Sequence, residues 1–215
     1  MGKSAVIICD GEFPRKDYPL YVLRSADYTV CCDGALRKYL RRMGGERLPD
    51  AVIGDMDSLP KSMQKKYAGL IVRVSEQDDN DQTKAFRYVL EHFPEVTDIH
   101  ILGATGLRED HTIGNISLLM EYARSFDTGG RNVDMISDYS TIFAISDSCE
   151  IDVGEGRRIS IFSPDNSLNI RSEGLVWQTS GVVFDNWWKA TLNRACSDRV
   201  RLTFSHPSVA LVILD

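Results

Sequence analysis

The hydrophobic pattern of this chain changes its period near residue 128, and this change constrains the fold more than any other feature. Before that point, short apolar runs alternate with segments whose apolar residues recur at helical spacing. The runs cover residues 5–9, 28–32, 51–53, 71–74 and 99–102, and the helical segments cover 35–43, 61–67, 81–92 and 110–124. Such alternation is typical of a parallel sheet with helices on both faces. It predicts a Rossmann-like α/β domain.

The second part of the chain has the alternating pattern of β-strands. After Thr128, apolar residues occupy every second position in three segments, at 133–135, 159–161 and 200–204. This alternation indicates strands with one buried face, and residues such as Gly154 and Asn166 mark turns between them. We therefore predict an α/β domain over residues 1–128, followed by a small all-β sandwich domain over residues 129–215.

Composition restricts the class of ligand and the compartment. The formal net charge is −6, and sequence-independent binding of nucleic acid needs a basic surface, so we expect no nucleic-acid partner. The five cysteines are scattered and include no CxxC pair, which predicts buried thiols in a reducing cytoplasm rather than disulfides or a zinc site. The apolar run at 5–9 is too short for a signal peptide or a membrane span. We expect a cytoplasmic protein without membrane association.

Aspartates gather where the predicted strands end. Most of them follow an apolar run within a short polar or glycine-bearing turn, and they are Asp33, Asp55, Asp57, Asp78, Asp79, Asp81 and Asp110. The carboxyl ends of parallel strands share one edge of a sheet, where ligands bind. Neighbouring carboxylates repel each other unless a cation is held between them. Because Mg²⁺ combines carboxylates, waters and substrate phosphates, this rim predicts a magnesium and polyphosphate site.

Each acidic motif also has an ordinary structural explanation. The segment Gly54-Asp55-Met56-Asp57-Ser58 could chelate one ion if the backbone curves at its glycine, or could be a polar turn capped by its own aspartates. The acids at 77–81 precede a predicted helix, whose dipole stabilises negative groups without any ligand. Lys84 lies one turn after Asp81 and could pair with it or bind a phosphate. Neither motif alone establishes a metal site.

A glycine-bearing turn links the strand at 99–102 to the next helix. It runs Gly103-Ala104-Thr105-Gly106-Leu107-Arg108-Glu109-Asp110-His111. Its glycines and the helix N-terminus could present N–H donors to an anion, and Arg108 could bind a phosphate bidentately. His111 and Asn115 share a helix face, and Asp110 is the predicted N-cap. The chain lacks a P-loop and a kinase motif set, so phosphate binding would depend on metal, Arg108 and backbone donors.

In this order, the motifs resemble those of the thiamine pyrophosphokinase family. The resemblance covers about residues 30–120, through 33–35, 54–58, 77–85 and 103–115, and more loosely 174–177 and 190–193. It implies Mg²⁺-dependent transfer of the terminal pyrophosphoryl group of ATP to the hydroxyethyl oxygen of thiamine, giving AMP and thiamine diphosphate. It also implies a homodimer whose thiamine sites lie between the nucleotide- and metal-binding domain of one subunit and the β domain of the other.

The resemblance also implies roles for individual residues. The expected metal ligands are Asp55, Asp57, Asp78 and Asp81, and these acids with Arg108 and Asp110 form the expected catalytic set. The residues expected around ATP and thiamine are Asp33, Lys84, Gly103, Thr105, Gly106, His111, Asn115, Trp177, Trp187 and Asn193. Thiamine is an aromatic cation that favours an aromatic wall, for which Trp188 is a further candidate. Tryptophans of a small sandwich, however, more commonly belong to its core.

Departures from the family pattern leave the acceptor open. Leu192 stands where the family has a serine near the pyrimidine, Ala190 replaces a glycine, and Asn80 stands where many members have threonine. One alternative is a pyrophosphokinase for another small alcohol, and a second is a module that binds Mg²⁺-nucleotide without catalysis. A third is a metal-free structural role. It predicts that alanine at Asp55 and Asp57 leaves ligand binding unchanged and stabilises the fold by relieving repulsion.

Overall fold

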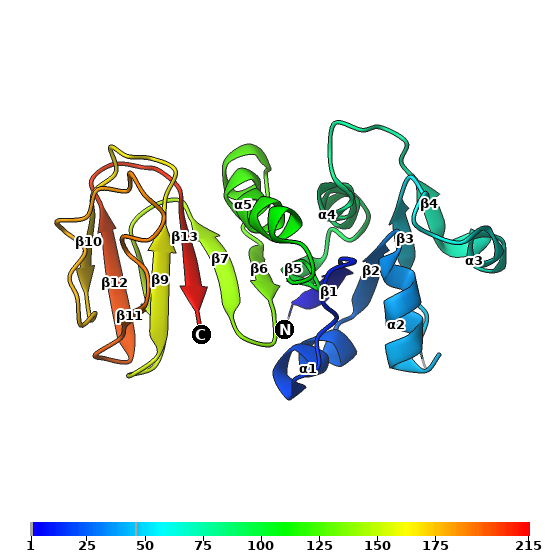
Figure 1. Cartoon of the computed structure of the whole chain (residues 1–215), viewed down its shortest axis with the longest axis horizontal. Helices are drawn as coiled ribbons and strands as arrows, with labels where there is room; N and C mark the ends of the chain where they lie inside the picture. Colours follow the sequence, from blue (N-terminus) through cyan, green and yellow to red (C-terminus); the bar gives the residue numbers. More distant parts are fainter. Residues whose placement is uncertain (1, 46) are drawn as a thin grey trace. The chain divides into compact units, whose positions relative to one another are not determined.

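The computed structural model describes residues 2–45 and 47–215, and the chain forms two compact units. The first unit comprises Met1–Leu118 and Thr128–Asp138, and the second comprises Leu119–Asp127 and Tyr139–Asp215. Both units are drawn in Figure 1. The division differs from the predicted one because the strand at 132–136 belongs to the first unit, whereas the sequence pattern assigns it to the β domain.

Parallel strands form the sheet of the first unit, in the order β6-β5-β1-β2-β3-β4 (Figure 1). Their bounds are β1 Lys3–Ile8, β2 Tyr28–Cys32, β3 Ala51–Gly54, β4 Ile71–Arg73, β5 Val96–Leu102 and β6 Asn132–Ile136. The chain moves outward from β1 to β4 and then returns to the other side of β1 with β5. The strand order therefore reverses between β1 and β5, and such a switch point is where open α/β sheets bind ligands.

Helices connect these strands. They are α1 Asp17–Ser25, α2 Ala35–Met43, α3 Lys61–Lys66, the 3₁₀ turn η1 Ala68–Leu70, α4 Asp81–His92 and α5 Glu109–Ser125. Helix α4 begins after Asn80, whose side chain accepts a hydrogen bond from the N–H of Thr83 and so caps the helix. The predicted N-cap of α5 is incorrect, because that helix begins at Glu109, before Asp110. Helix α1 is not among the predicted helices.

The core of the first unit lies between its sheet and the helices. Val6 and Ile8 of β1 and Leu36 and Tyr39 of α2 are fully buried in one apolar cluster. Strands covered on both faces are apolar at nearly every position, and β1 and β2 follow this rule. The continuous apolar runs therefore predict a parallel sheet because both faces of its strands are buried.

The second unit contains two antiparallel sheets with the strand orders β11-β9-β13-β7 and β10-β12-β8. The strands are β7 Thr141–Ile145, β8 Cys149–Asp152, β9 Arg158–Phe162, β10 Ile170–Glu173, β11 Asn193–Arg194, β12 Arg199–Phe204 and β13 Ala210–Leu214. Ile159 and Ile161 from one sheet and Val200 and Leu202 from the other are buried in a single cluster. The predicted β-sandwich is confirmed. By contrast, β6 pairs in parallel with β5. Its alternating pattern suits a strand of either unit, so the pattern alone did not identify its neighbour.

Two further expectations concern membranes and thiols. Among the described residues, no helix has the length and apolar character that crossing a membrane requires. Cys9, Cys31 and Cys32 are buried and free, as predicted, whereas Cys149 is half-buried and Cys196 is exposed. The prediction that the cysteines are buried is therefore wrong for Cys196 and only partly correct for Cys149.

Candidate functional site

A cavity of about 380 Å³ opens at the carboxyl edge of the parallel sheet. Its lining comes from the ends of β1, β2 and β5 and the first turns of α4 and α5, and includes Asp10, Asp33, Asp81, Arg108, His111 and Asn115. The volume falls in the range of ordinary small-molecule sites. The cavity lies at the switch point between β1 and β5, so the predicted location of the site is supported by the strand order.

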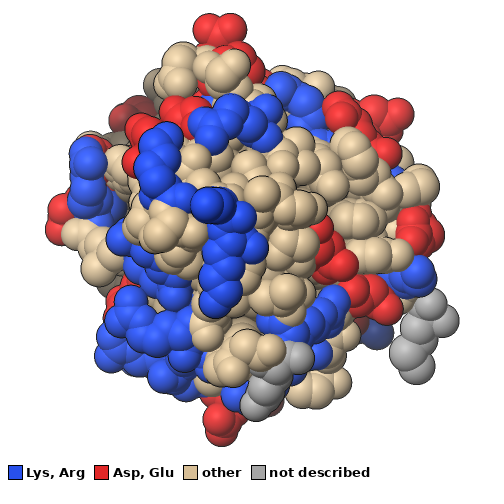
Figure 2. Space-filling model, turned by 90° about the vertical axis from the view of Figure 1, so that its right-hand side faces the viewer, with Lys and Arg blue, Asp and Glu red and all other residues tan. Residues whose placement is uncertain are grey.

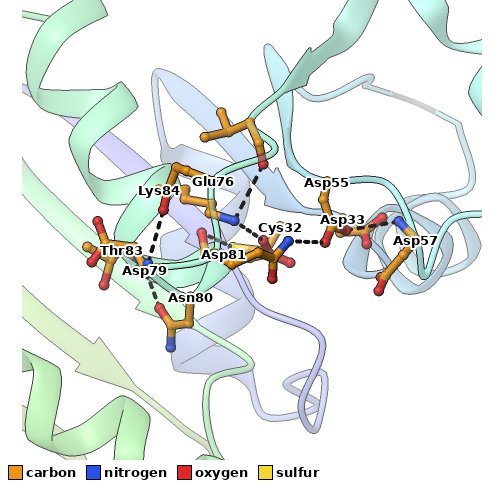
Figure 3. A network of polar contacts seen from close by, with 12 residues as sticks. Cys32, Asp33, Asp55, Asp57, Glu76, Asp79, Asn80, Asp81, Thr83 and Lys84 are labelled. Carbon is orange, nitrogen blue, oxygen red and sulfur yellow. Dashed lines mark hydrogen bonds and ion pairs between the residues drawn. The ribbon is translucent and has the colours of Figure 1, made fainter.

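Three of the predicted acids converge beside this cavity. Carboxylate oxygens of Asp33, Asp55 and Asp57 all lie within 4.8 Å of one another. Asp33 directly follows β2 and the other two follow β3, and the parallel pairing of Cys32 with Ile53 brings the two turns side by side (Figure 3). The group is therefore produced by strand register rather than by spacing within one motif.

Backbone and amide donors hold these carboxylates in place. Asp33 Oδ2 accepts a 3.0 Å hydrogen bond from the N–H of Ser58, and Asp55 Oδ1 accepts one of 3.0 Å from the N–H of Asp57. Gln77 donates to Asp55 Oδ2 at 3.1 Å. The N–H of Asp57 and the amide of Gln77 keep the pKa of Asp55 below its usual value, because hydrogen bonds to the charged form favour it.

Asp33 is the least solvated of the three acids. Its side chain is buried, with 2% exposure, and its Oδ1 has no hydrogen-bond partner within the described parts of the chain. Burial raises the pKa of Asp33, the N–H of Ser58 opposes this rise, and Asp57 and Asp55 add to it. No lysine or arginine among residues 2–45 and 47–215 lies within ion-pair distance of these three carboxylates. An unpaired buried oxygen in a group of three carboxylates that lacks a direct ion pair among the described residues fits a divalent cation with oxygen ligands.

Asp81 and Lys84 lie next to this group at the start of α4. Lys84 is buried, and its Nζ lies 3.8 Å from Asp81 Oδ1 and 3.4 Å from the carbonyl oxygen of Val74. Burial raises the pKa of Asp81 to about 6, although Lys84 lowers it, and Asp33 adds to the rise. A Cβ at Gly54 would lie 3.1 Å from Asp81 Oδ1. Glycine at this position therefore lets the two acidic turns approach each other.

The other acids of the second motif point to different partners. The N–H groups of Asp78 and Asp79 donate to Glu76 Oε2 at 2.9 and 3.2 Å, and Asp79 pairs with Arg87 at 2.7 Å. The exposed carboxylate of Asp78 lies outside the group of three. Its predicted role as a metal ligand stays a prediction. Glu76, which no sequence signal marks, organises this turn.

The glycine-bearing turn after β5 packs against the chain that follows β1. The N–H of Gly11 donates to the carbonyl of Gly103 at 2.7 Å, and that of Glu12 donates to the carbonyl of Thr105 at 2.8 Å. Gly103 and Gly106 have φ of 66° and 77°. A Cβ at Gly103 would lie 2.7 Å from a backbone oxygen. Gly106 lines the cavity, while Gly103 and Thr105 hold the turn in place.

Arg108 and Asp110 bind each other at the mouth of the cavity. Arg108 Nε lies 3.1 Å from Asp110 Oδ1, and Arg108 Nη2 lies 2.5 Å from Asp110 Oδ2. The guanidinium group, followed by the N–H of His111, lowers the pKa of Asp110. Both side chains are exposed, so the pair contributes little to stability. An arriving phosphate must compete with this carboxylate for Arg108.

Asn115 connects three segments of the site. Its Nδ2 donates to the carbonyl of Ala104 at 2.8 Å, and its Oδ1 accepts from the side chain of Asn80 at 3.1 Å. It thereby ties the glycine-bearing turn to the starts of α4 and α5. His111, one turn earlier, also lines the cavity and is exposed.

Asp10 is a site residue that the sequence reasoning missed. It lines the cavity and pairs with Lys38 at 2.7 Å. The signal was present, because Asp10 and Gly11 follow the apolar run of β1 just as Asp33 and Gly34 follow that of β2. Applied to every strand, the rule that ligands gather at strand ends would have included it.

The tryptophans of the second unit are on the surface, so the alternative that they belong to the core is wrong, while a role of Trp177 and Trp187 in binding thiamine stays a prediction. Trp177, Trp187 and Trp188 are 61%, 60% and 69% exposed. Buried Asn193 accepts a hydrogen bond from the N–H of Trp177 at 3.2 Å and donates to its carbonyl at 2.6 Å. Next to it, Leu192 is 76% exposed. Asn193 therefore fixes the backbone that carries one of the exposed indoles.

Comparison with protein families gives a consistent result over both units. The family model described as thiamin pyrophosphokinase, catalytic domain, matches residues 20–128, and the one described as thiamin pyrophosphokinase, substrate-binding domain, matches residues 141–208. The chain belongs to the thiamin pyrophosphokinase family. The predicted family resemblance is thus confirmed. The family's catalytic domain corresponds to the region that carries the acidic group.

Individual relatives support the family and the fold. Thiamin pyrophosphokinase 1 of Caenorhabditis elegans is 33% identical over 104 residues, which are 46% of this chain and 42% of that relative. The chain thus matches less than half the length of this thiamin pyrophosphokinase. The crystal structure of thiamine pyrophosphokinase from Bacillus subtilis aligns over 99% of both chains with a TM-score of 0.77 and 20% identity. Yeast thiamin pyrophosphokinase aligns over 100% of this chain and 87% of its own, with a TM-score of 0.79 and 20% identity. At these identities the two structures show a common fold.

Proposed function

We propose that this chain transfers a pyrophosphoryl group from ATP to thiamine, giving thiamine diphosphate and AMP, with Mg²⁺ as cofactor. One observation carries the proposal. Three carboxylates converge at the carboxyl edge of an α/β sheet, beside the cavity at its switch point, without an ion-pair partner among the described residues, and one of them has a buried unpaired oxygen. Membership of the thiamin pyrophosphokinase family supports the choice of substrates.

Asp33, Asp55 and Asp57 are the residues we propose as Mg²⁺ ligands, with Asp78 and Asp81 as further candidates nearby. A Mg²⁺ ion held by these carboxylates would neutralise charge on the phosphate oxygens. The donors that hold Asp55 ionised and the buried position of Asp33 fix these carboxylates before the substrate arrives. Such pre-organisation matters because phosphoryl-type transfer depends mainly on positioning and charge neutralisation.

Arg108 is the proposed cationic ligand of the nucleotide. Its partner Asp110 is equally exposed, so moving the guanidinium from a carboxylate to a phosphate costs little and preserves bidentate hydrogen bonding. Gly106, His111 and Asn115 line the same cavity and are proposed to shape the nucleotide pocket. Lys84, buried beside Asp81, offsets part of the negative charge on the rim.

The β unit is proposed to bind thiamine. Trp177 and Trp187 are exposed and offer flat surfaces to an aromatic cation, and Asn193 holds the backbone of Trp177. We propose a homodimer with twofold symmetry in which each thiamine site uses both subunits, and a cytoplasmic location, where free thiols persist.

The test is AMP formation by the purified chain with ATP, Mg²⁺ and thiamine. We expect AMP only when thiamine is present, and none from an Asp55→Asn, Asp57→Asn variant. Glu91→Gln is the matched control, because Glu91 is an exposed acid on α4 away from the rim. ATP binding without AMP from any alcohol would overturn the catalytic proposal in favour of a binding module.

A second candidate is pyrophosphoryl transfer to a different small alcohol. It is favoured by Leu192, which places an exposed apolar side chain next to Asn193 where the family pattern has a hydroxyl. A panel of pterin and thiamine-precursor alcohols distinguishes the two. Another alcohol with a kcat/KM well above that of thiamine would establish the alternative.

A further inference from the structure

A second groove, of about 350 Å³, lies on the first unit beside the acidic site and has the opposite charge. Its charged lining residues are Glu12, Arg15, Lys38, Arg41 and Arg42, and its apolar lining residues are Phe13 and Leu107. Gly11 and Leu107 line both cavities. The groove is lined by four cations and one acid, so its charge is positive although the formal net charge of the chain is −6.

Two of these four cations already have partners. Lys38 pairs with Asp10 at 2.7 Å and donates to the carbonyl of Gly11 at 2.8 Å, and Arg15 pairs with Glu12 at 3.3 Å. Two acids therefore offset two of the four positive charges.

The other two cations, Arg41 and Arg42, have no partner among the described residues. Arg41 and Arg42 are exposed, and within the described residues neither makes an ion pair or a side-chain hydrogen bond. The groove consequently carries, on adjacent residues, two guanidinium groups that no described acid pairs with.

The helix dipole explains only part of this arrangement. Arg41 and Arg42 lie in the last turn of α2, where cations are favoured without any ligand. The dipole does not explain why Arg15, from a separate segment before α1, lines the same hollow. Helices α2 and α3 contain no acidic residue, and Figure 2 shows Lys and Arg side chains gathered on this side of the first unit.

We propose that this groove binds a polyphosphate without a metal ion, with Arg41 and Arg42 as its principal ligands. Arginine matches phosphate with a planar, bidentate set of donors. Two adjacent guanidinium groups without an ion pair among the described residues suit an anion with more than one charged phosphoryl group. The volume suits a small molecule. The polyphosphate is either inorganic or the phosphate chain of a nucleotide. The proposal does not depend on pyrophosphoryl transfer to thiamine.

The experiment is titration calorimetry of the full chain with inorganic tripolyphosphate in EDTA, so that the acidic site holds no metal. ATP and adenosine in the same buffer distinguish an inorganic ligand from a nucleotide. We expect Arg41→Gln, Arg42→Gln to weaken tripolyphosphate binding at least about tenfold. Arg37→Gln is the matched control, because Arg37 is an exposed arginine of α2 that does not line the groove. Both sets of substitutions are on the surface, so the fold is retained.

Further outcomes are decisive. Asp55→Asn, Asp57→Asn should bind tripolyphosphate as the wild type does, even if it makes no AMP, which separates this proposal from the proposed reaction. No binding in EDTA, or equal losses from Arg37→Gln and the double arginine variant, would overturn it. Binding of single-stranded RNA in preference to tripolyphosphate, lost in the same double variant, would also overturn it, since the surface would then be a nucleic-acid site.

Discussion

The acidic rim of the first unit and the tryptophan segment of the second, residues 174–193, are fixed in different ways. On the rim, hydrogen bonds from Ser58 and Gln77 hold carboxylates that are buried or partly buried. In the tryptophan segment, Asn193 holds the backbone, while the indoles themselves are exposed. The rim is therefore pre-organised for a small charged ligand. The tryptophan segment leaves its indole rings exposed to solvent, with only the backbone fixed.

The largest expected effect comes from removing two charges from the rim. Asp55→Asn, Asp57→Asn should lower thiamine-dependent AMP formation at least about 1,000-fold, because charge neutralisation is a major part of such catalysis. In EDTA the variant should keep nearly the same melting temperature, because weaker hydrogen bonds to position 55 offset the relief of repulsion with Asp33. Steady-state kinetics and thermal melts in EDTA measure both effects. Unchanged kinetics would leave the metal-free structural role as the better explanation.

Substitutions at two positions of the tryptophan segment should have different effects, one on stability and the other on thiamine binding. Phe184 is 4% exposed and Trp187 is 60% exposed, three residues apart. Phe184→Ala should cost about 3–5 kcal/mol of unfolding free energy by leaving a cavity, whereas Trp187→Ala should change it by less than about 0.5 kcal/mol. Trp187→Ala should instead raise the KM for thiamine about tenfold through the lost cation–π contact. Equal losses of stability in urea titrations of the two variants would contradict the comparison.

Mg²⁺ should stabilise the protein through the acidic rim and not through the tryptophan segment. Mg²⁺ at about one hundred times its Kd should raise the unfolding free energy by about 2.7 kcal/mol. The increase should disappear in EDTA and in Asp55→Asn, Asp57→Asn, but persist in Trp187→Ala and Glu91→Gln. Calorimetric melts at fixed protein concentration provide the measurement. An equal gain in the double aspartate variant would place the ion elsewhere.

The smallest expected effect concerns an acid that does have a basic partner. His100 Nδ1 lies 2.8 Å from Asp134 Oδ1. Burial lowers the pKa of His100, but the hydrogen bond and charge of Asp134 outweigh this, and the pKa is raised above 6.5. The stabilisation is therefore complete below the unfolded pKa and is lost as pH rises through the folded one.

The corresponding variant is His100→Gln. It should be less stable than the wild type by about 1 kcal/mol in acidic buffer, and the gap should close in alkaline buffer. Urea titrations across this pH range test the expectation. A gap that widens with pH would contradict the sign of the pKa shift and weaken the contrast between this acid and those of the rim.

The sequence predictions were accurate where the structure depends on neighbouring residues and failed where it depends on contacts between distant ones. Helices α2 and α4 have the predicted bounds, because each has a local apolar stripe next to a cap or turn. The strand at 132–136 was assigned to the wrong unit, because its alternation does not specify which neighbour it pairs with. Residue type favoured the core as the alternative place for the tryptophans, and this was wrong because type alone does not determine burial.

For the site, the sequence determined which acids end which strands, and hence that a charged rim exists at one edge of the sheet. It did not determine which acids meet. Strand register groups Asp33 with Asp55 and Asp57, while local hydrogen bonds turn the segment around Asp78 toward Glu76. The basic groove likewise forms only when residues 12–15 approach α2. The physical reason is that period and turn chemistry act within a few residues, whereas register and packing act between residues far apart in the chain.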